Sequence, residues 1–440
     1  MNLKFFYKPF INLAFNKRNQ LIQKKIIRYK EVTKEDINLY QIKEFNKIWA
    51  HASANIPFYK YFKQKYSLPN NIKSLKEIED FPQTSKKIFL DHKDLIFEKN
   101  KKYQTITTGG TSGHPTHFIT SKSDADNNYA NTYLARMRFN INPLDRMILI
   151  WGHSHLFGSG IKGKLNNIKR NIYDFLLDIK RLNAYDLGPK SMQNYIKEIE
   201  ACNPIVIIGY TSSLFTLSKY ITDRNISLNN IHNLLGVILT SEAITQNDIN
   251  IIEKALDTNV ILEYGACETG VIAYSKPKRK KDYHVFWDSF IAQEDSDCKL
   301  LISTISKRAF PLIRYQTDDE LTGADNSSSI LSFESIHGRE KDIFSIFDKN
   351  GDLIYFTGLV IEHILKAIPG VHFHSFEQKK IGNLTIFLVI DEKFIFEEIV
   401  RVFNAEILKE NPNTNLDGFN FIKISKPIRT LAGKNIANIS

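Results

Sequence analysis

The sequence predicts an α/β protein with a large N-terminal α/β domain containing mixed sheets and a small C-terminal α+β domain. Its 440 residues exceed what one hydrophobic core usually accommodates. Short apolar runs alternate with helical patterns along most of the chain, which is typical of a sheet covered by helices. After about Arg339 the pattern changes to a hairpin followed by further strands and helices, over roughly 100 residues that can fold alone. We therefore expect two domains, 1–338 and 339–440.

The large domain is expected to begin with helices. Apolar residues recur at helical spacing between residues 35 and 65, and Pro57 interrupts the pattern. Residues 86–102 are charged and are predicted to form a connection. Residues 105–108 then predict a short strand, which leads into a turn rich in glycine and hydroxyl side chains.

Four apolar runs predict further strands, and helical patterns separate the later ones. We expect strands at Met147–Trp151, Ile205–Tyr210, Leu235–Thr240 and Val260–Tyr264, and helices at Ser191–Ala201, Ser213–Arg224 and Thr245–Leu256. Strands that alternate with helices favour a parallel sheet. Such sheets bind ligands at the carboxyl ends of their strands.

The small domain is expected to begin with a hairpin closed by the turn Lys349-Asn350-Gly351-Asp352. The remaining patterns alternate between strand and helix. The predicted elements are strands at Asp342–Phe347 and Leu353–Phe356, a helix at Val360–Ile368, strands at Phe373–Gln378 and Leu384–Ile390, a helix at Phe396–Glu410 and a strand at Asn420–Ser425.

The charge and cysteine content bear on whether nucleic acid is a partner and on whether the protein is located in a reducing compartment. Lys and Arg number 59 against 48 Asp and Glu, a net charge of +11. The basic residues are spread along the chain instead of forming a stripe, so nucleic acid is not an expected partner. Because the three cysteines form no CxxC pair, a disulfide framework or cysteine zinc site is disfavoured, and a reducing cytoplasm is the expected location.

Residues 1–30 are the segment of the chain for which contact with a membrane is considered. No apolar run approaches the roughly 20 residues that cross a bilayer. One face of a predicted helix nevertheless carries Leu3, Phe6, Phe10 and Leu13, with basic residues around and after them. The favoured interpretation is a helix docked on its own domain. The alternative is a weak, peripheral contact of residues 1–30 with the anionic inner face of the membrane.

The strongest local motif is residues 107–116, TTGGTSGHPT. Its glycines allow the backbone to approach an anion closely, and its hydroxyls can donate hydrogen bonds to phosphate. In isolation such a turn is more often an ordinary surface loop. Residues 158–164, GSGIKGK, match a phosphate-loop spacing without the closing Ser or Thr, so we expect a flexible basic loop there.

Two carboxylate motifs follow apolar runs. Tyr264 ends a strand and can stack on a base, while Glu268 can hold Mg²⁺; a core tyrosine beside an exposed glutamate is the alternative. Asp319 can accept ribose hydroxyls, with a solvated turn as the alternative. Because neighbouring side chains of an extended chain point opposite ways, Asp318 and Asp319 are not expected to form a paired carboxylate site.

The order of the motifs is more specific than any one of them. A Thr/Ser/Gly loop, Thr-Ser-Glu ending at Glu242, Tyr-Gly-x-x-Glu, Arg-Tyr-x-Thr-x-Asp, Gly-Arg-x-x-Asp and a terminal Arg-Thr-x-x-Gly-Lys follow one another. This order resembles the AMP-forming adenylate superfamily of acyl-CoA synthetases, nonribosomal adenylation domains and luciferases. Within it, Thr116 and the segment HASANIPFYKYF resemble the branch of phenylacetate–coenzyme A ligases and capsular polysaccharide (CapK-like) biosynthesis proteins.

The resemblance implies a chemistry and a mobile C-terminal domain. A carboxylate attacks the α-phosphorus of ATP, pyrophosphate leaves, and an acyl-adenylate forms with the help of Mg²⁺. A thiol, amine or hydroxyl then takes the acyl group. Coenzyme A, a carrier-protein thiol, an amino sugar and an amino acid are the acceptors that the resemblance leaves open.

The resemblance also implies roles for individual residues. Those that would cradle the β- and γ-phosphates are Thr108, Gly110, Thr111, Ser112 and Gly113. Those that would surround adenine are Glu242, Tyr264 and Gly265. Glu268 would bind Mg²⁺, with Thr269 beside the α-phosphate; Asp319 and Arg339 would hold the ribose. Lys341 would be the hinge, and Lys434 would bridge the carboxylate and the α-phosphate.

Two departures and two alternatives qualify the expected function. Gly109-Gly110 replaces a Ser-Gly, and Asp318 replaces a glycine that is usual in the superfamily. Asp318 adds negative charge, but it removes no ligand. We therefore expect an enzyme that activates a carboxylic acid for surface-polysaccharide biosynthesis. A catabolic aryl- or acyl-CoA ligase is one alternative. The other is a catalytically idle scaffold with an adenylate fold at the membrane surface, which the presence of Glu268 and Lys434 argues against.

Overall fold

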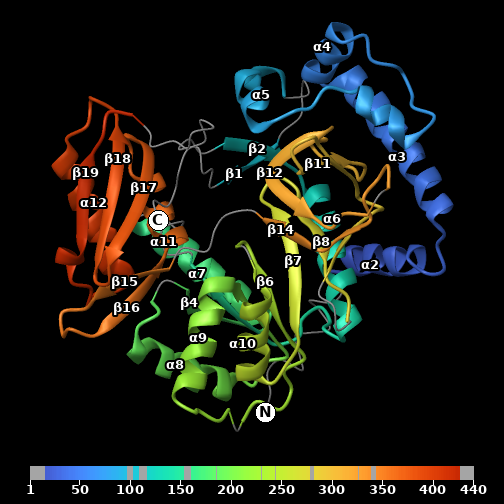
Figure 1. Cartoon of the computed structure of the whole chain (residues 1–440). Helices are drawn as coiled ribbons and strands as arrows, with labels where there is room; N and C mark the ends of the chain where they lie inside the picture. The colour runs from blue at the N-terminus through green and yellow to red at the C-terminus, as the bar shows by residue number, and fades with distance from the viewer. Residues whose placement is uncertain are drawn as a thin grey trace. The chain divides into compact units, whose positions relative to one another are not determined.

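The computed structural model contains helices and several sheets, so the predicted mixed α/β class is confirmed (Figure 1). It describes residues 15–96, 103–108, 116–152, 160–184, 186–228, 230–242, 244–277, 282–325, 327–337 and 343–426. The chain divides into two compact units. The first consists of Met1–Thr108, Thr116–Pro143 and Ile261–Arg339, and the second of Gly109–Pro115, Leu144–Val260 and Glu340–Ser440.

The helices at the start of the first unit follow the predicted pattern. They are α2 (Asn16–Arg28), α3 (Lys34–Asn55) and α4 (Pro57–Lys65). Thr33 and Asp36 form a reciprocal capping box at the start of α3. Pro57 occupies the first turn of α4, where its missing N–H costs no helical hydrogen bond. The break expected at Pro57 is therefore a junction between two helices.

The predicted connection at 86–102 is partly wrong, because α5 (Lys86–Asp91) and a 3₁₀ turn at Lys93–Leu95 lie within it. The Ser85 side chain accepts a hydrogen bond from the backbone N–H of Ile88, which starts the helix. Phe89 is then buried in an aromatic core. This core includes Phe45, Trp49, Phe58, Tyr59, Phe81, Phe310 and Tyr315. Tertiary packing of one phenylalanine thus stabilises a helix that its charged sequence does not suggest.

Three sets of antiparallel strands complete the first unit. β1 (Gln104–Thr108) pairs with β2 (Thr116–Thr120). A four-stranded sheet has the order β10 (Phe290–Glu294), β11 (Lys299–Thr304), β12 (Tyr315–Thr322) and β14 (Ser335–His337). A further set has the order β13 (Ser332–Phe333), β9 (Tyr283–Val285), β8 (Gly270–Tyr274) and β7 (Val260–Ala266).

The second unit contains the predicted parallel strands, in the order β6-β5-β3-β4. These are β3 (Met147–Trp151), β4 (Ile179–Asn183), β5 (Val206–Tyr210) and β6 (Gly236–Thr240). The helices α7 (Gly160–Leu176), α8 (Pro189–Cys202), α9 (Thr211–Asp223) and α10 (Gln246–Leu256) come from the same part of the chain (Figure 1). The predicted basic loop at 158–164 is wrong in its described part, because residues 160–164 begin α7.

The C-terminal elements match their predicted patterns closely. The hairpin is β15 (Ile343–Phe347) and β16 (Leu353–Thr357). Next come α11 (Gly358–Ala367), β17 (Val371–Lys380), β18 (Asn383–Ile390), α12 (Phe396–Glu410) and β19 (Phe419–Lys423). β17 and β18 are antiparallel, and β19 lies parallel to β18. The predicted domain boundary falls at 338–342, outside the described residues, and stays a prediction.

Helix α2 docks on the first unit, whereas the predicted apolar face of Leu3, Phe6, Phe10 and Leu13 lies outside the described residues and its docking stays a prediction. Helix α2 packs on α6 (Lys122–Arg136) and buries Ile22 and Lys25. The Lys25 Nζ lies 2.6 Å from Oδ2 of the buried Asp288, and Arg28 Nη1 lies 2.8 Å from the same oxygen. Burial lowers the pKa of Lys25, and Asp288 opposes this shift. Within the described residues, no helix is long and apolar enough to cross a membrane.

Candidate active site

Tyr264 and Asp319 meet through a hydrogen bond although they lie on different strands. The Tyr264 hydroxyl, on β7, donates to Oδ2 of Asp319, on β12, at 2.6 Å. Burial, with the neighbouring Asp319 charge, raises the pKa of Tyr264 well above its ordinary value. The hydroxyl therefore stays protonated at neutral pH and can act as a donor. Two predicted site residues are thus brought into direct contact.

Glu268 is held by a second tyrosine. It lies in the turn between β7 and β8, and its Oε1 accepts a hydrogen bond from the Tyr315 hydroxyl at 2.8 Å. Tyr315 is buried, and burial and then the Glu268 charge raise its pKa. Its ring stacks on Phe89 of α5, with centroids 5.7 Å apart and an interplanar angle of 7°. The unexpected helix α5 therefore helps to orient the donor to Glu268.

The turn that carries Glu268 is tightly constrained. Gly270 has φ of +73°, and a Cβ there would lie 2.3 Å from the Asn128 amide oxygen. A Cβ on Gly265 would lie 2.3 Å from the Gly270 carbonyl oxygen. The buried Thr269 hydroxyl donates to the Gly270 carbonyl at 2.9 Å and accepts from the Ala266 N–H at 3.2 Å. In this structure Thr269 and Gly265 shape the turn.

Arg308 stabilises this turn through hydrogen bonds to its backbone. Its Nη2 donates to the Glu268 carbonyl oxygen at 2.6 Å and its Nη1 to the Thr269 carbonyl oxygen at 2.8 Å. Its Nε pairs with Oδ1 of the buried Asp124, on α6, at 3.2 Å. Burial lowers the pKa of Arg308, while Asp124 and Glu268 oppose the shift. A largely buried cation therefore sets the backbone on which the Glu268 side chain stands.

Glu242 has a different environment, within the second unit. It follows β6, and its carboxylate accepts from the Ser212 N–H at 2.6 Å and the Ser212 hydroxyl at 2.9 Å. Ser212 lies in the first turn of α9, where a negative charge is stabilised by free N–H groups. Ser241 just before it has φ of +72°. Glu242 thus caps a helix at the carboxyl end of a parallel strand.

Asp318 and Asp319 separate as expected for neighbours on a strand. The Asp318 side chain is 78% exposed and lies 3.9 Å from Lys299 Nζ, whereas Asp319 faces Tyr264. Asp318 also has φ of +68°, a left-handed conformation that explains why a glycine suits this position. The added charge points to solvent and is partly balanced by Lys299.

Several predicted site residues cannot be placed. Gly110, Thr111, Ser112, Gly113, Arg339, Lys341 and Lys434 lie outside the described residues. Thr108 is the last residue of β1, which leads into the predicted phosphate loop. The order of strand and loop around Thr108 agrees with the motif, and the contacts of the loop stay predictions.

The donor set at Glu268 suits magnesium better than a fully protein-bound metal. Among the described residues, no group of three or more His, Cys, Asp or Glu side chains could hold a metal ion. Magnesium commonly takes one or two protein carboxylates and completes its octahedron with water and substrate phosphates. Glu268, oriented through Oε1 by Tyr315, fits that arrangement.

Sequence patterns alone assign no role in the site to Tyr315, Arg308 and Asp124. Tyr315 stood within the Arg-Tyr-x-Thr-x-Asp motif without an assigned role. Asp124 follows Ser121 at capping-box spacing, a pattern that indicates a helix start and gives no sign of the ion pair with Arg308. Such contacts depend on segments that are distant in sequence.

Replacing Arg308 with methionine should lower the free energy of unfolding of the first unit by about 3–5 kcal/mol, because buried Asp124 would lose its cation. Denaturation followed by tryptophan fluorescence measures the change, since Trp49 and Trp287 are buried in this unit. Arg28→Met is the matched control: Asp288 would keep Lys25 as its partner. Equal losses in the two variants would contradict the role of Arg308.

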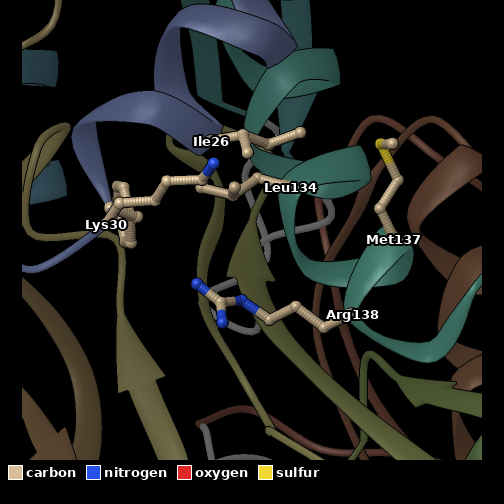
Figure 2. Close-up of a pocket in the computed structure, with 6 residues that line it drawn as sticks. Ile26, Lys30, Leu134, Met137 and Arg138 are labelled. Carbon is tan, nitrogen blue, oxygen red and sulfur yellow. The ribbon is translucent and has the colours of Figure 1, made fainter.

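A cavity of about 280 Å³ in the first unit involves none of the predicted site residues. It is lined by Ile26, Tyr29, Lys30, Leu134, Met137 and Arg138. The side chains of Lys30, just after α2, and of Arg138, in the 3₁₀ turn Met137–Phe139 after α6, extend toward the cavity (Figure 2). The Arg138 guanidinium also lies 5.6 Å from the centroid of the Tyr274 ring. We assign this cavity no role in the candidate active site.

The fold is shared with solved adenylate-forming ligases. A 2-hydroxyisobutyryl-CoA ligase in complex with 2-HIB-AMP and CoA, in the thioesterification state, matches with a TM-score of 0.60 and 14% identity, over 92% of this chain and 90% of that one. An open conformation of that ligase matches with a TM-score of 0.52 and 16% identity, over 91% and 90% of the two chains. The fold is that of the AMP-forming adenylate superfamily, as the ordered motifs predicted.

Sequence relatives define the branch more closely. Protein CapK of Staphylococcus aureus is 22% identical over 410 residues, which cover 91% of this chain and 88% of CapK. The phenylacetate-coenzyme A ligase of Aromatoleum evansii is 22% identical over 335 residues, covering 72% and 73% of the two chains. No protein-family model matches the chain. In sequence the chain is similar to CapK and to a phenylacetate-coenzyme A ligase, and its fold is shared with solved AMP-forming ligases.

Proposed function

We propose that the chain activates a carboxylic acid with ATP, releases pyrophosphate, and transfers the acyl group from the acyl-adenylate to a thiol or amine. The observation that carries this proposal is the pair of tyrosine–carboxylate hydrogen bonds, Tyr264 to Asp319 and Tyr315 to Glu268. They orient two carboxylates that the family motifs assign to the ribose and to magnesium. Such positioning is the main contribution of a protein to phosphoryl-type transfer.

The ribose would be held through a carboxylate of the first unit. Asp319 would accept the ribose hydroxyls with help from Arg339, and the protonated Tyr264 hydroxyl would keep the Asp319 carboxylate oriented. Tyr264 and Gly265 would border the adenine, as the motif Tyr-Gly-x-x-Glu implies. Glu242, whose carboxylate is oriented by Ser212, is the further residue that the motifs assign to adenine.

The phosphates would be bound by the loop that follows β1. In this proposal the backbone and hydroxyl groups of Thr108, Gly110, Thr111, Ser112 and Gly113 donate to the β- and γ-phosphates. Glu268 would hold Mg²⁺, which supplies charge neutralisation at the phosphates when bound. Thr269 would stand beside the α-phosphate. Lys434 would neutralise charge between the acid and the α-phosphate, and Lys341 would act as the hinge of the mobile domain at 339–440.

We propose surface-polysaccharide biosynthesis as the setting, because the similarity to CapK extends over most of both chains. The similarity to a phenylacetate-coenzyme A ligase favours a second candidate, a catabolic aryl- or acyl-CoA ligase. The acceptor separates the two: an amino sugar, an amino acid or a carrier-protein thiol suits the first, and coenzyme A the second. The proposed location is the cytoplasm, with residues 1–30 in weak contact with the inner face of the membrane.

Exchange of labelled pyrophosphate into ATP tests the first half-reaction without knowledge of the acceptor. Exchange should appear with one class of acid in a panel of aryl, short-chain, hydroxy and amino acids, and should require magnesium. Addition of coenzyme A, amino sugars or amino acids should then release AMP with only one acceptor class. Absence of exchange with every acid would favour the idle-scaffold alternative.

A further inference from the structure

Helix α7 differs from an ordinary surface helix in which of its side chains are buried and which are exposed. Among its described side chains, the acidic Asp174 is the buried one. Asp174 Oδ2 and Oδ1 accept hydrogen bonds from Nε and Nη2 of Arg181, on β4, at 2.6 and 3.0 Å. A surface helix normally turns its apolar residues to the core and its charges to water. In α7 an ion pair faces inward.

The opposite face of α7 is an apolar stripe. Leu165, Ile168, Ile172 and Phe175 follow one another at spacings of three and four residues, which places them along one side of a helix. Each of these side chains is between 53% and 55% exposed, and Tyr173 beside them is 50% exposed. Contiguous apolar surface of this kind marks an interaction site.

We propose that α7 lies flat on a membrane surface containing anionic lipid, with its apolar stripe among the acyl chains. The net positive charge of α7 favours an anionic membrane surface over other partners. Its sequence contains Lys162, Lys164, Lys169 and Arg170 against one acidic residue, and Asp174 is already paired with Arg181. Basic residues around an apolar stripe are characteristic of helices that rest in the interface between lipid headgroups and acyl chains.

The same charge disfavours the other occupants of the stripe. A second copy of α7 would bring like charges together across a symmetric contact. Residues 1–14 are apolar and basic as well, with Lys4 and Lys8, so they would repel α7 in the same way. The 17 residues of α7 do not qualify as a membrane-crossing helix, which leaves an orientation parallel to the surface. This proposal is independent of the adenylation chemistry above.

Sedimentation of the full-length chain with vesicles tests the proposal. Binding is expected with mixed phosphatidylglycerol and phosphatidylcholine, and not with phosphatidylcholine alone. Ile168→Gln together with Ile172→Gln removes half of the stripe without changing the charge, and should weaken binding about tenfold or more. Leu39→Gln with Ile395→Gln is the matched control, because these side chains are 61% and 60% exposed elsewhere. Pyrophosphate exchange should be unchanged in both double variants.

Hydroxyl-radical footprinting separates α7 from any binding by residues 1–30. Tyr173 and Phe175 should be oxidised in buffer and protected when the anionic vesicles are added. Protection already in buffer would mean that protein covers the stripe, and would overturn the proposal. Loss of vesicle binding equal in the two double variants, or no binding by the unmodified chain, would overturn it too. A change of oligomeric state in the Ile168→Gln, Ile172→Gln variant, without one in the control variant, would also overturn the proposal.

Discussion

Lys434→Ala is expected to abolish acyl-adenylate formation and to leave acyl transfer from pre-made acyl-adenylate intact. In the proposed adenylation state the Lys434 ammonium lies between the acid and the α-phosphate, where two negative groups must approach each other. Excluded water strengthens such a charge interaction. Loss of a positioned stabilising group of this kind costs about 10²–10³ in rate or more. Pyrophosphate exchange and single-turnover acyl transfer measure the two half-reactions separately.

The matched control for this variant is Lys426→Ala. Lys426 is also a lysine near the C-terminus, and it is an exposed residue just after β19. Its removal should leave both half-reactions close to those of the unmodified chain. Normal pyrophosphate exchange in Lys434→Ala would make Lys434 a solvated charge and would favour the idle-scaffold alternative.

Glu268→Gln is expected to reduce magnesium-dependent pyrophosphate exchange at least about tenfold and to raise the magnesium concentration needed for half-maximal exchange. Glutamine keeps the shape of the side chain, and its amide oxygen can still accept the Tyr315 hydrogen bond. The Arg308 contacts to the Glu268 and Thr269 carbonyls involve only backbone oxygens and should persist. The variant therefore removes the charge while the turn keeps its shape. Magnesium titration of the exchange rate measures the effect.

An exposed carboxylate of the same unit provides the comparison. Glu294, at the end of β10, is exposed. Glu294→Gln also removes one negative charge and should leave the magnesium dependence unchanged. An unchanged magnesium dependence in Glu268→Gln would remove this residue from the metal site. Thermal denaturation of both variants should show similar stability, which would tie any difference in exchange to the chemistry.

Local patterns predicted most elements correctly, because the forces that form them act over a few residues. The capping box at Thr33 and the proline at the start of α4 depend only on neighbours within a turn. The hairpin of β15 and β16 is joined by a turn with Gly351 at φ of +85°, which its sequence signalled. Strands β3, β5, β6 and β7 were visible as apolar runs of ordinary strand length.

Two local predictions were wrong, the first of them for a tertiary reason. The charged segment at 86–91 is helical, because Phe89 finds a place among aromatic rings contributed by distant segments. The segment at 160–164 belongs to α7, although its two glycines and two lysines are typical of a loop. Neither propensity nor motif spacing contains the information about which distant surface is available for packing.

The amino-acid sequence was enough to predict the order of elements and motifs, and the superfamily that this order resembles. The tertiary structure alone decided which tyrosine holds which carboxylate. Tyr264 and Asp319 are 55 positions apart, and Tyr315 and Glu268 are 47 positions apart. It also decided that Arg308 fastens the turn of Glu268 and that the apolar stripe of α7 faces outward. The physical reason is the sequence separation of the interacting residues. Hydrogen bonds along a helix or turn join near neighbours, whereas the contacts of the two tyrosines and of Arg308 exist only after strands and helices have packed.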